Sequence, residues 1–268
     1  MVFEKYHGTG NDFILLKAAP TNPSELAKRI CDRHFGIGAD GILYPTSSSI
    51  ADLKMNYYNS DGSIAPMCGN GMRCFAAFAL KHGLIHSTSV SIETLAGIIP
   101  VSFDAAQDLI KIDLGVPITS LNYPDVEKPI TKFAKHSLVI EGEQVDFYVL
   151  NMGTIHTVIY LDDHLSLNWR KIAEPFSKHP FFPKQTNVNF VEVLDEYTQK
   201  VTTFERGAGW TLSCGTGSSA SAAVSVILGK TKNIVETIVP GGTLSVYVHD
   251  RIELAGPAAY IASGNYEV

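Results

Sequence analysis

The chain has 268 residues, of which 45% are hydrophobic and 18% charged, and its formal net charge is −6. This composition is typical of a globular protein with room for one large domain or two domains of about 100–150 residues. The negative charge and the lack of a basic block argue against nucleic acid or a membrane as a partner. No apolar run approaches the roughly 18 residues of a membrane span, and the first residues lack a signal-peptide pattern, so we expect a cytoplasmic protein.

Short β-rich segments alternate with a few helices. Four segments rich in β-branched and aromatic residues are expected to be strands: 2–7, 13–18, 41–46 and 53–59. A helix is predicted over 22–34, where Asn22 is the candidate N-cap and a proline follows it. Two further helices are predicted over 69–82 and 215–228. Both are apolar over most of their circumference and are followed by a glycine, so we expect both to be buried.

Two segments whose cysteines stand 146 positions apart share one plan. The first contains Cys68-Gly-Asn-Gly and the second contains Cys214-Gly-Thr-Gly, each at the start of a predicted helix. Nine positions before each cysteine, a polar residue (Asn59 or Glu205) ends a strand-like run. A duplicated thiol at a duplicated helix start suggests a symmetric reaction.

A weaker duplication extends beyond the cysteine segments. Residues 8–12 resemble 152–156, and residues 93–103 resemble 237–247. The proline-rich stretch 117–129 is a plausible crossover between the two halves.

The duplication predicts an α/β (α+β) fold with two pseudo-symmetric lobes. We place the N-terminal lobe, carrying Cys68, at 1–116 and the C-terminal lobe, carrying Cys214, at 117–268. Each lobe would wrap a mixed, mostly antiparallel sheet around a central helix, and the C-terminal tail could pack back on the N-terminal lobe. Clefts between two such lobes are common places for small-molecule sites.

A cysteine at a helix N-terminus has a chemical consequence. The unpaired N–H groups and the positive end of the helix dipole lower a thiol pKa from about 8.5 towards neutrality, and flanking glycines let an anion approach the backbone. Two such sites could hold one carboxylate and present a thiol and a thiolate to opposite faces of the neighbouring carbon. That arrangement suits inversion of an α-carbon by proton transfer.

Other readings of the cysteines and glycines are less favoured. Cys31 and Cys74 are expected to be small buried hydrophobic residues. Four cysteines at these spacings indicate neither a disulfide framework nor a zinc site, and we expect no metal. The glycine motifs lack the context of a dinucleotide or pyridoxal site, so no cofactor is expected, and phosphate binding is a minor alternative because no Walker lysine is present.

The motifs resemble those of the diaminopimelate epimerase family. The similar segments, in the family's order, are His7-Gly-Thr-Gly-Asn-Asp-Phe13, Asn59-Ser-Asp-Gly62, Met67-Cys-Gly-Asn-Gly-Met-Arg-Cys74, Glu205-Arg-Gly207 and Ser213-Cys-Gly-Thr-Gly217. The resemblance implies a pyridoxal-independent isomerase, most simply converting LL- to meso-diaminopimelate in lysine and peptidoglycan precursor synthesis. It also implies a cytoplasmic homodimer with a small amino-acid substrate.

The resemblance further implies roles for individual residues. Cys68 and Cys214 would exchange acid and base roles, with Glu205 and His156 next to the reacting centre. The backbone of Gly69, Asn70, Gly215 and Thr216 would hold the α-carboxylate. The substrate would also contact Asn11, Asn59, Thr154, Asn187 and Arg206. The remaining histidines considered are expected at the surface: His82, His86, His164, His179 and His249.

Two positions depart from the family pattern. Thr154 stands where the family has an asparagine that holds the far end of diaminopimelate, and Trp210 stands where a glutamate is common. A threonine offers one donor rather than two, so racemisation of another amino acid, histidine first, is the alternative. The indole of Trp210 could line the pocket or pack beneath its loop.

Two other classes of protein remain open at this stage. In the first, an isomerase or hydrolase of the same fold group uses Glu205 as its base and does not need the thiols. In the second, the chain is an amino-acid binding module without catalysis.

Overall fold

The computed structural model describes residues 1–162 and 168–267, and the chain divides into two compact units. The first unit consists of Met1–Asp113 together with Ala255–Val268, and the second of Leu114–Leu254. The chain leaves the first unit within β7 (Leu109–Gly115) and returns within β16 (Ile252–Gly256). In the described part of the chain, none of the helices combines the length and apolar character that a bilayer span requires.

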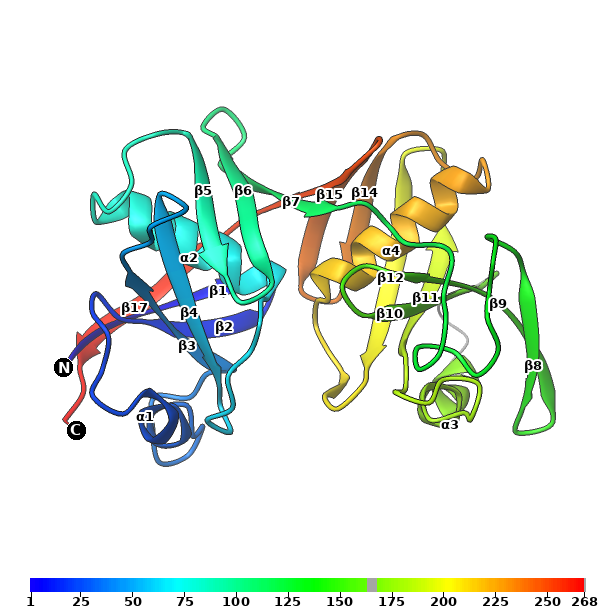
Figure 1. The fold of residues 1–268 in the computed structure, drawn as a ribbon, viewed down its shortest axis with the longest axis horizontal. Helices are drawn as coiled ribbons and strands as arrows, with labels where there is room; N and C mark the ends of the chain where they lie inside the picture. The colour runs from blue at the N-terminus through cyan, green and yellow to red at the C-terminus, as the bar shows by residue number, and fades with distance from the viewer. Residues whose placement is uncertain (163–167, 268) are drawn as a thin grey trace. The chain divides into compact units, whose positions relative to one another are not determined.

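The first unit is a mixed sheet with the strand order β17-β1-β2-β3-β4-β5-β6-β7 (Figure 1). The β2–β3 and β4–β5 pairs are parallel, and the other neighbours are antiparallel. Its remaining strands are β1 (Val2–Gly8), β2 (Asn11–Leu15), β3 (Gly41–Thr46), β4 (Leu53–Asn59), β5 (Ser89–Thr94), β6 (Gly97–Asp104) and β17 (Ala259–Asn265). Helix α2 (Gly69–Lys81) packs against β1, β2 and β3, and α1 (Pro23–Ile30) packs against β4.

The second unit repeats this plan with the strand order β8-β9-β10-β11-β12-β14-β15 (Figure 1). The β10–β11 and β12–β14 pairs are parallel, and the short β13 pairs with the end of β12. Its strands are β8 (His136–Ile140), β9 (Glu143–Asn151), β10 (Ile155–Tyr160), β11 (Asn187–Val193), β12 (Thr198–Glu205), β13 (Gly209–Trp210), β14 (Ile234–Val239) and β15 (Gly242–Val248). The 3-10 helix η1 (Asn168–Ile172) and α3 (Ala173–Ser177) precede β11, and α4 (Gly215–Ile227) packs against β9 to β12, β14 and β15.

The two units correspond element by element. The run β1 to β6 matches β9, β10, β11, β12, β14 and β15, with the parallel pairs in the same places. Helices α2 and α4 each have 13 residues and begin directly after a cysteine. The prediction of a mixed α/β fold, with two similarly built lobes each holding a central helix, is confirmed.

The central helices also end in the same way. Gly83 and Gly229 adopt left-handed conformations, with φ of 64° and 68°, which a side chain would disfavour. In each helix the residue after the glycine donates its N–H to a carbonyl five residues back: Leu84 to Ala79 (2.9 Å) and Lys230 to Ser225 (2.8 Å). These are Schellman closures, and they confirm the predicted glycine stops.

Helix α1 differs from its predicted length. Asn22 caps it as expected, because its Oδ1 accepts a hydrogen bond from the N–H of Glu25 (3.4 Å). The helix stops at Ile30, however, rather than at His34. The side chain of Asp32 accepts hydrogen bonds from the N–H groups of His34 and Phe35 (2.7 Å each), which closes a local turn in place of another helical turn.

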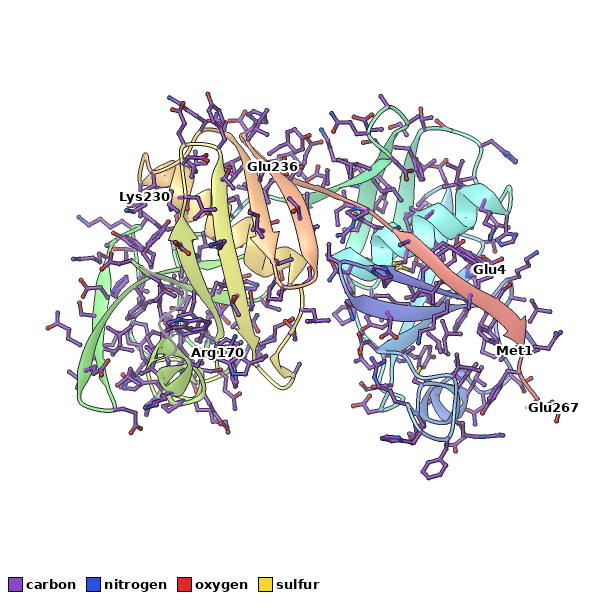
Figure 2. The ribbon with its side chains drawn as sticks, turned by 180° about the vertical axis from the view of Figure 1, so that it is seen from behind. Met1, Glu4, Arg170, Lys230, Glu236 and Glu267 are labelled. Atoms are coloured by element: carbon purple, nitrogen blue, oxygen red, sulfur yellow. The ribbon has the colours of Figure 1, made fainter. Side chains whose placement is uncertain are left out.

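The two ends of the described chain lie side by side in the first unit. Strand β17 pairs with β1, and the amino group of Met1 donates to the carbonyl of Tyr266 (2.7 Å). Figure 2 shows Met1 and Glu267 at the same end of this strand pair.

The prediction that five histidines lie at the surface is confirmed only in part. His86 and His249 are exposed, whereas His179 is half-buried and His82 contacts the carboxylate of Glu4 (2.8 Å). His164 lies outside the described residues.

Candidate active site

Cys68 is the residue from which α2 begins. Its backbone is extended (φ −142°, ψ 124°), and its sulfur accepts a hydrogen bond from the N–H of Gly71 (3.5 Å). The N–H groups at a helix start have no partner within the helix and attract anions. The half-buried sulfur therefore lies beside the unpaired backbone N–H groups at the start of α2.

Asn11 connects this helix start to β2. Cys68 Sγ donates to Asn11 Oδ1 (3.4 Å), and the same oxygen accepts from Asn70 Nδ2 (3.4 Å). The Asn11 amide nitrogen donates in the opposite direction, to Asp40 Oδ2. Because both ends of the amide are occupied, its orientation is fixed, with the carbonyl towards the sulfur.

An ion-pair network lies behind Asn11, and the sequence did not reveal it. Arg33 donates to both oxygens of Asp12 (3.1 and 2.7 Å) and to Asp40 (2.8 Å), while Lys5 pairs with Asp12 (2.9 Å). Burial raises the pKa of Asp12, but Arg33 and Lys5 outweigh burial and lower it overall. In the sequence, the only sign of this network was that Asp12 (in GTGND) and Asp40 (in GIGAD) each stand beside the start of a predicted strand.

Asn59 ends β4 at the equivalent point to Glu205, which ends β12. It faces Gly41 of β3 in the ladder, and its Nδ2 donates to Ser63 Oγ (3.0 Å).

Cys214 precedes α4 in a similar extended conformation (φ −118°, ψ 108°) but is only 6% exposed. Its sulfur contacts Thr216 Oγ1 (3.6 Å). Burial raises its pKa well above that of an ordinary thiol, and the negative charge of Glu205 raises it further. The expected lowering by the helix start is thus outweighed in this unit.

Glu205 adjoins Cys214 and accepts a hydrogen bond from Thr211 Oγ1 (2.7 Å). Thr211 follows β13, the short strand that pairs with the end of β12. This hairpin holds the carboxylate at the start of α4.

His156 lies at the centre of a buried amide and hydroxyl cluster. Its Nε2 contacts Thr154 Oγ1 (3.1 Å) and Asn187 Nδ2 (3.5 Å), and its Nδ1 contacts Asn189 Nδ2 (3.3 Å). Complete burial, with the nearby charge of Arg206, lowers the pKa of His156 to about 3. The imidazole is therefore neutral at physiological pH and is hydrogen-bonded to its amide and hydroxyl neighbours.

Asn189 is a second residue that the sequence did not single out. It accepts a hydrogen bond from Thr203 Oγ1 (3.0 Å) and donates to the carbonyl of Thr157 (2.9 Å). Its position two residues after Asn187, on the same face of β11, was the available signal.

Arg206 lies next to Asn187 and is half-buried. Its backbone N–H donates to Asn187 Oδ1 (3.0 Å), and its Nη1 donates to the carbonyl of Lys184 (3.1 Å). The guanidinium is therefore tied to the loop before β11.

Trp210 packs against aromatic side chains of the second unit. Its ring centroid is 5.5 Å from that of Trp169 and 5.3 Å from that of Phe204, and Arg170 (labelled in Figure 2) lies 5.2 Å above it. The indole is 37% exposed. These contacts support the β12–β13 hairpin.

The predicted site residues thus form two groups. In the first unit the structure brings together Asn11, Cys68, Gly69 and Asn70, with Asn59 bonded to its own turn. In the second unit it brings together Thr154, His156, Asn187 and the backbone of Arg206, and separately Glu205, Cys214, Gly215 and Thr216. All four cysteines are free thiols, and no group of three metal-binding side chains occurs within the described residues.

The chain is similar in sequence to proteins of one family. The family model described as diaminopimelate epimerase matches residues 3–119 and 148–261. The diaminopimelate epimerase of Caldanaerobacter subterraneus is 40% identical over 274 residues, covering 100% of both chains. That of Carboxydothermus hydrogenoformans is 39% identical, covering 99% of each chain, and one from Methanococcus maripaludis is 36% identical, covering 100% of each.

Solved structures show the fold at lower identity. A phenazine biosynthesis protein of the PhzF family from Bacillus anthracis has a TM-score of 0.70 at 16% identity, covering 100% of this chain and 99% of its own. A hydroxyproline epimerase from Agrobacterium vitis, with bound trans-4-hydroxy-L-proline, has a TM-score of 0.69 at 16% identity, covering 98% and 91%.

Gly217→Ala and Gly71→Ala form a matched test of the helix starts. A Cβ at Gly217 would lie 2.4 Å from Asn189 Oδ1, whereas one at Gly71 would meet the Phe13 ring at 3.2 Å and Leu43 Cδ1 at 3.5 Å. We expect Gly217→Ala to lower the free energy of unfolding by about 1–3 kcal/mol and Gly71→Ala to cost less than about 1 kcal/mol. Urea unfolding of both variants measures this, and equal losses would contradict the proposed crowding.

His156 provides a pH test. Its folded pKa of about 3 lies below the unfolded value of 6.5, so only the unfolded state binds this proton between those limits. Its contribution to stability is complete above about pH 6.5 and is lost as pH falls towards 3, by up to about 1.4 kcal/mol per pH unit. We expect the ¹⁵N shifts of the ring to stay those of neutral imidazole from pH 8 to pH 5. A titration near pH 6.5 would show that the imidazole is accessible and charged.

Proposed function

Because the chain belongs to the diaminopimelate epimerase family, it is an isomerase, and we propose that it converts LL-diaminopimelate to meso-diaminopimelate by a two-base reaction without pyridoxal phosphate. The observation that carries this proposal is the equivalence of Cys68 and Cys214. Each directly precedes a 13-residue central helix, at the same place in one repeated order of strands.

The proposed reaction moves two protons. One sulfur, as thiolate, takes the proton from the α-carbon and becomes a thiol. The other sulfur, as thiol, gives its proton to the opposite face of the same carbon and becomes a thiolate. The proposal therefore requires both half-sites to act on one α-carbon, and the overall charge of the pair is unchanged by turnover.

The helix starts are suited to hold the α-carboxylate through the backbone N–H groups of Gly69, Asn70, Gly215 and Thr216. These donors also stabilise the charge that spreads onto the carboxylate when the α-proton leaves. Each sulfur lies beside the N–H groups of its own helix start. A carboxylate bound by those groups therefore has its α-carbon close to that sulfur.

The surrounding residues take supporting roles in this proposal. Asn11 orients Cys68, and Glu205 keeps Cys214 protonated until it donates. His156 positions Thr154 and Asn187, which, with Asn59 and Arg206, form the part of the site that we assign to the rest of the substrate.

The proposal includes a cytoplasmic homodimer. Four free thiols suit a reducing compartment, since an oxidising one would expose two reactive cysteines to disulfide formation. The dimer follows from the family resemblance.

One observation favours a second substrate class. Thr154 replaces the family's asparagine, and its hydroxyl is already bonded to His156 Nε2 and Asn187 Nδ2. A substrate whose far end needs fewer hydrogen bonds from residue 154, such as histidine, is the alternative to diaminopimelate.

Alanine variants of the four cysteines test the two-base reaction. We expect Cys68→Ala and Cys214→Ala each to lower epimerisation by at least about 10²–10⁴-fold, the usual contribution of an acid or base. The matched controls Cys31→Ala and Cys74→Ala should retain activity, because both side chains are buried in the core and neither residue directly precedes a central helix.

Deuterium exchange distinguishes the competing classes. Incubation in D₂O should place deuterium at the α-carbon during turnover by the wild-type chain. Turnover that survives in Cys68→Ala would favour a carboxylate base at Glu205, and saturable binding without any exchange would indicate a binding module.

A substrate panel tests the side chain that the site accepts. We expect LL-diaminopimelate to be epimerised with a kcat/KM at least about tenfold above that for L-histidine, because a second charged end can bind Arg206. Chiral chromatography measures both reactions, with Thr154→Asn as the comparison variant. A preference for L-histidine that Thr154→Asn reverses would establish the alternative substrate.

A further inference from the structure

Arg73 is a buried charge that the reaction described above does not use. It lies on α2, one turn after Cys68 and Gly69, and its side chain is 0% exposed. Arginine is almost never fully buried unless it is paired. Its position near the helix start therefore requires a physical reason.

The guanidinium is held entirely by neutral oxygens. It donates to Asn70 Oδ1 (2.9 Å), to the carbonyls of Gly69 and Pro257 (3.3 Å each) and to Thr9 Oγ1 (3.4 Å). None of these acceptors is a carboxylate, and no acid is paired with Arg73 in the part of the chain that the structure describes. The positive charge is hydrogen-bonded but not neutralised.

The backbone around Arg73 is shaped to admit it. A Cβ at Gly8 would lie 3.0 Å from Arg73 Nη2, so the absence of a side chain there leaves room for the guanidinium. The next residue, Thr9, is 2% exposed and has a φ of 51°, a conformation that costs about 1 kcal/mol for a residue with a side chain. The strained residue, Thr9, is therefore also one whose hydroxyl accepts a hydrogen bond from the guanidinium.

The charge acts on two sulfur atoms, those of Cys68 and Cys74. Burial raises the pKa of Cys74 to about 12, so Cys74 remains a thiol at physiological pH. Cys68 is half-buried and is the sulfur that the positive charge can favour as an anion.

The other ionisable groups on the elements packed against α2 are already engaged. On β1, Glu4 bonds Lys81 and His82, Tyr6 donates to Glu4, His7 accepts from the Gly10 N–H, and Lys5 pairs with Asp12 of β2. Arg33 contacts Asp12 and Asp40, and burial raises the pKa of Tyr44 on β3 to about 12.

The residues at the equivalent positions of the second unit differ in charge from those of the first. Arg73 lies four residues after Gly69 in α2. The equivalent residue of α4, four residues after Gly215, is Ser219, which is also 0% exposed. The place of Asn59, at the end of β4, is taken by Glu205. The duplicated plan thus puts a cation near Cys68 and an anion beside Cys214.

We propose that Arg73 is a positioning residue that fixes Gly69 and Asn70 at the start of α2 and supplies the positive charge that makes Cys68 the thiolate of the resting protein. Its hydrogen bond to Asn70 Oδ1 turns the amide so that Nδ2 points to Asn11 Oδ1, the oxygen that Cys68 contacts. The consequence for catalysis rests on the proposed function: Cys68 is the base of the free enzyme and Cys214 its acid.

The test measures the Cys68 thiol without using activity. In a parent with Cys31→Ala, Cys74→Ala and Cys214→Ala, Cys68 is the one thiol left of the four in the sequence. The rate of its alkylation by iodoacetamide is followed from pH 5 to pH 10 by intact mass, since only the thiolate reacts. We expect Arg73→Met to raise the midpoint by about one pH unit, which lowers the rate about tenfold on the acidic side.

Two further variants complete the test. Arg73→Lys keeps a charge but loses the fork, so its midpoint should lie between those of the parent and Arg73→Met, while its turnover in the four-cysteine chain should fall about tenfold. The matched control Ser219→Ala, at the equivalent buried position, should leave the midpoint unchanged. Circular dichroism and thermal unfolding report whether each variant is folded.

The outcomes separate this inference from the proposed function. A folded Arg73→Met with the parent's midpoint overturns the inference. If Arg73→Met does not fold, Arg73→Lys decides, and parent-like values of both midpoint and turnover overturn it. A shifted midpoint in a chain that epimerises no amino acid would leave the role of Arg73 standing and refute the proposed function.

Discussion

The structure depends on one local constraint, which is that each central helix begins directly after an extended cysteine. The extended residue places its sulfur on the same side as the first unpaired N–H groups of the helix, and in the first unit the sulfur contacts one of them. Glycines keep the approach open, and at Gly217 the neighbouring Asn189 leaves no room for a side chain. The sulfur and the unpaired N–H groups beside it are therefore parts of one local structure, and the proposed reaction uses both.

The two copies of this structure are alike in backbone and different in charge. The polar groups around Cys68 are amides, held by Asp40 on one side and by Arg73 on the other. The groups around Cys214 include the carboxylate of Glu205, in surroundings that exclude water from the sulfur. Burial raises the pKa of Cys214, and the neighbouring charge of Glu205 adds to that effect.

The sequence predicted the backbone of this site better than its electrostatics. The repeat of Cys-Gly-x-Gly, with matched strands before it and glycines after it, located both helices to within a residue at each end. The pKa of Cys214 was not predictable in the same way, because burial depends on contacts between segments distant in sequence. The same holds for the Arg33–Asp12–Asp40 network and for Asn189, whose partners come from other elements. His156 looked like a residue beside the reacting centre, and only its complete burial shows that it stays neutral.

The charge difference suits the proposed two-base reaction. A productive enzyme holds one proton on a pair of sulfurs, and two identical, independent thiols reach that state in at most about half of the molecules, divided equally between the two arrangements. Under the roles proposed for Arg73 and Glu205, opposite charges at equivalent positions concentrate the population in one arrangement, with the proton on Cys214. Each turnover then leaves the proton on the other sulfur, where Arg73 and Glu205 both disfavour it. The free protein must return the proton before it can act again in the same direction, whereas the reverse reaction can begin at once from that form. In the proposed reaction the duplication provides two faces for one chemistry, and the substitutions that distinguish its halves determine which face acts first.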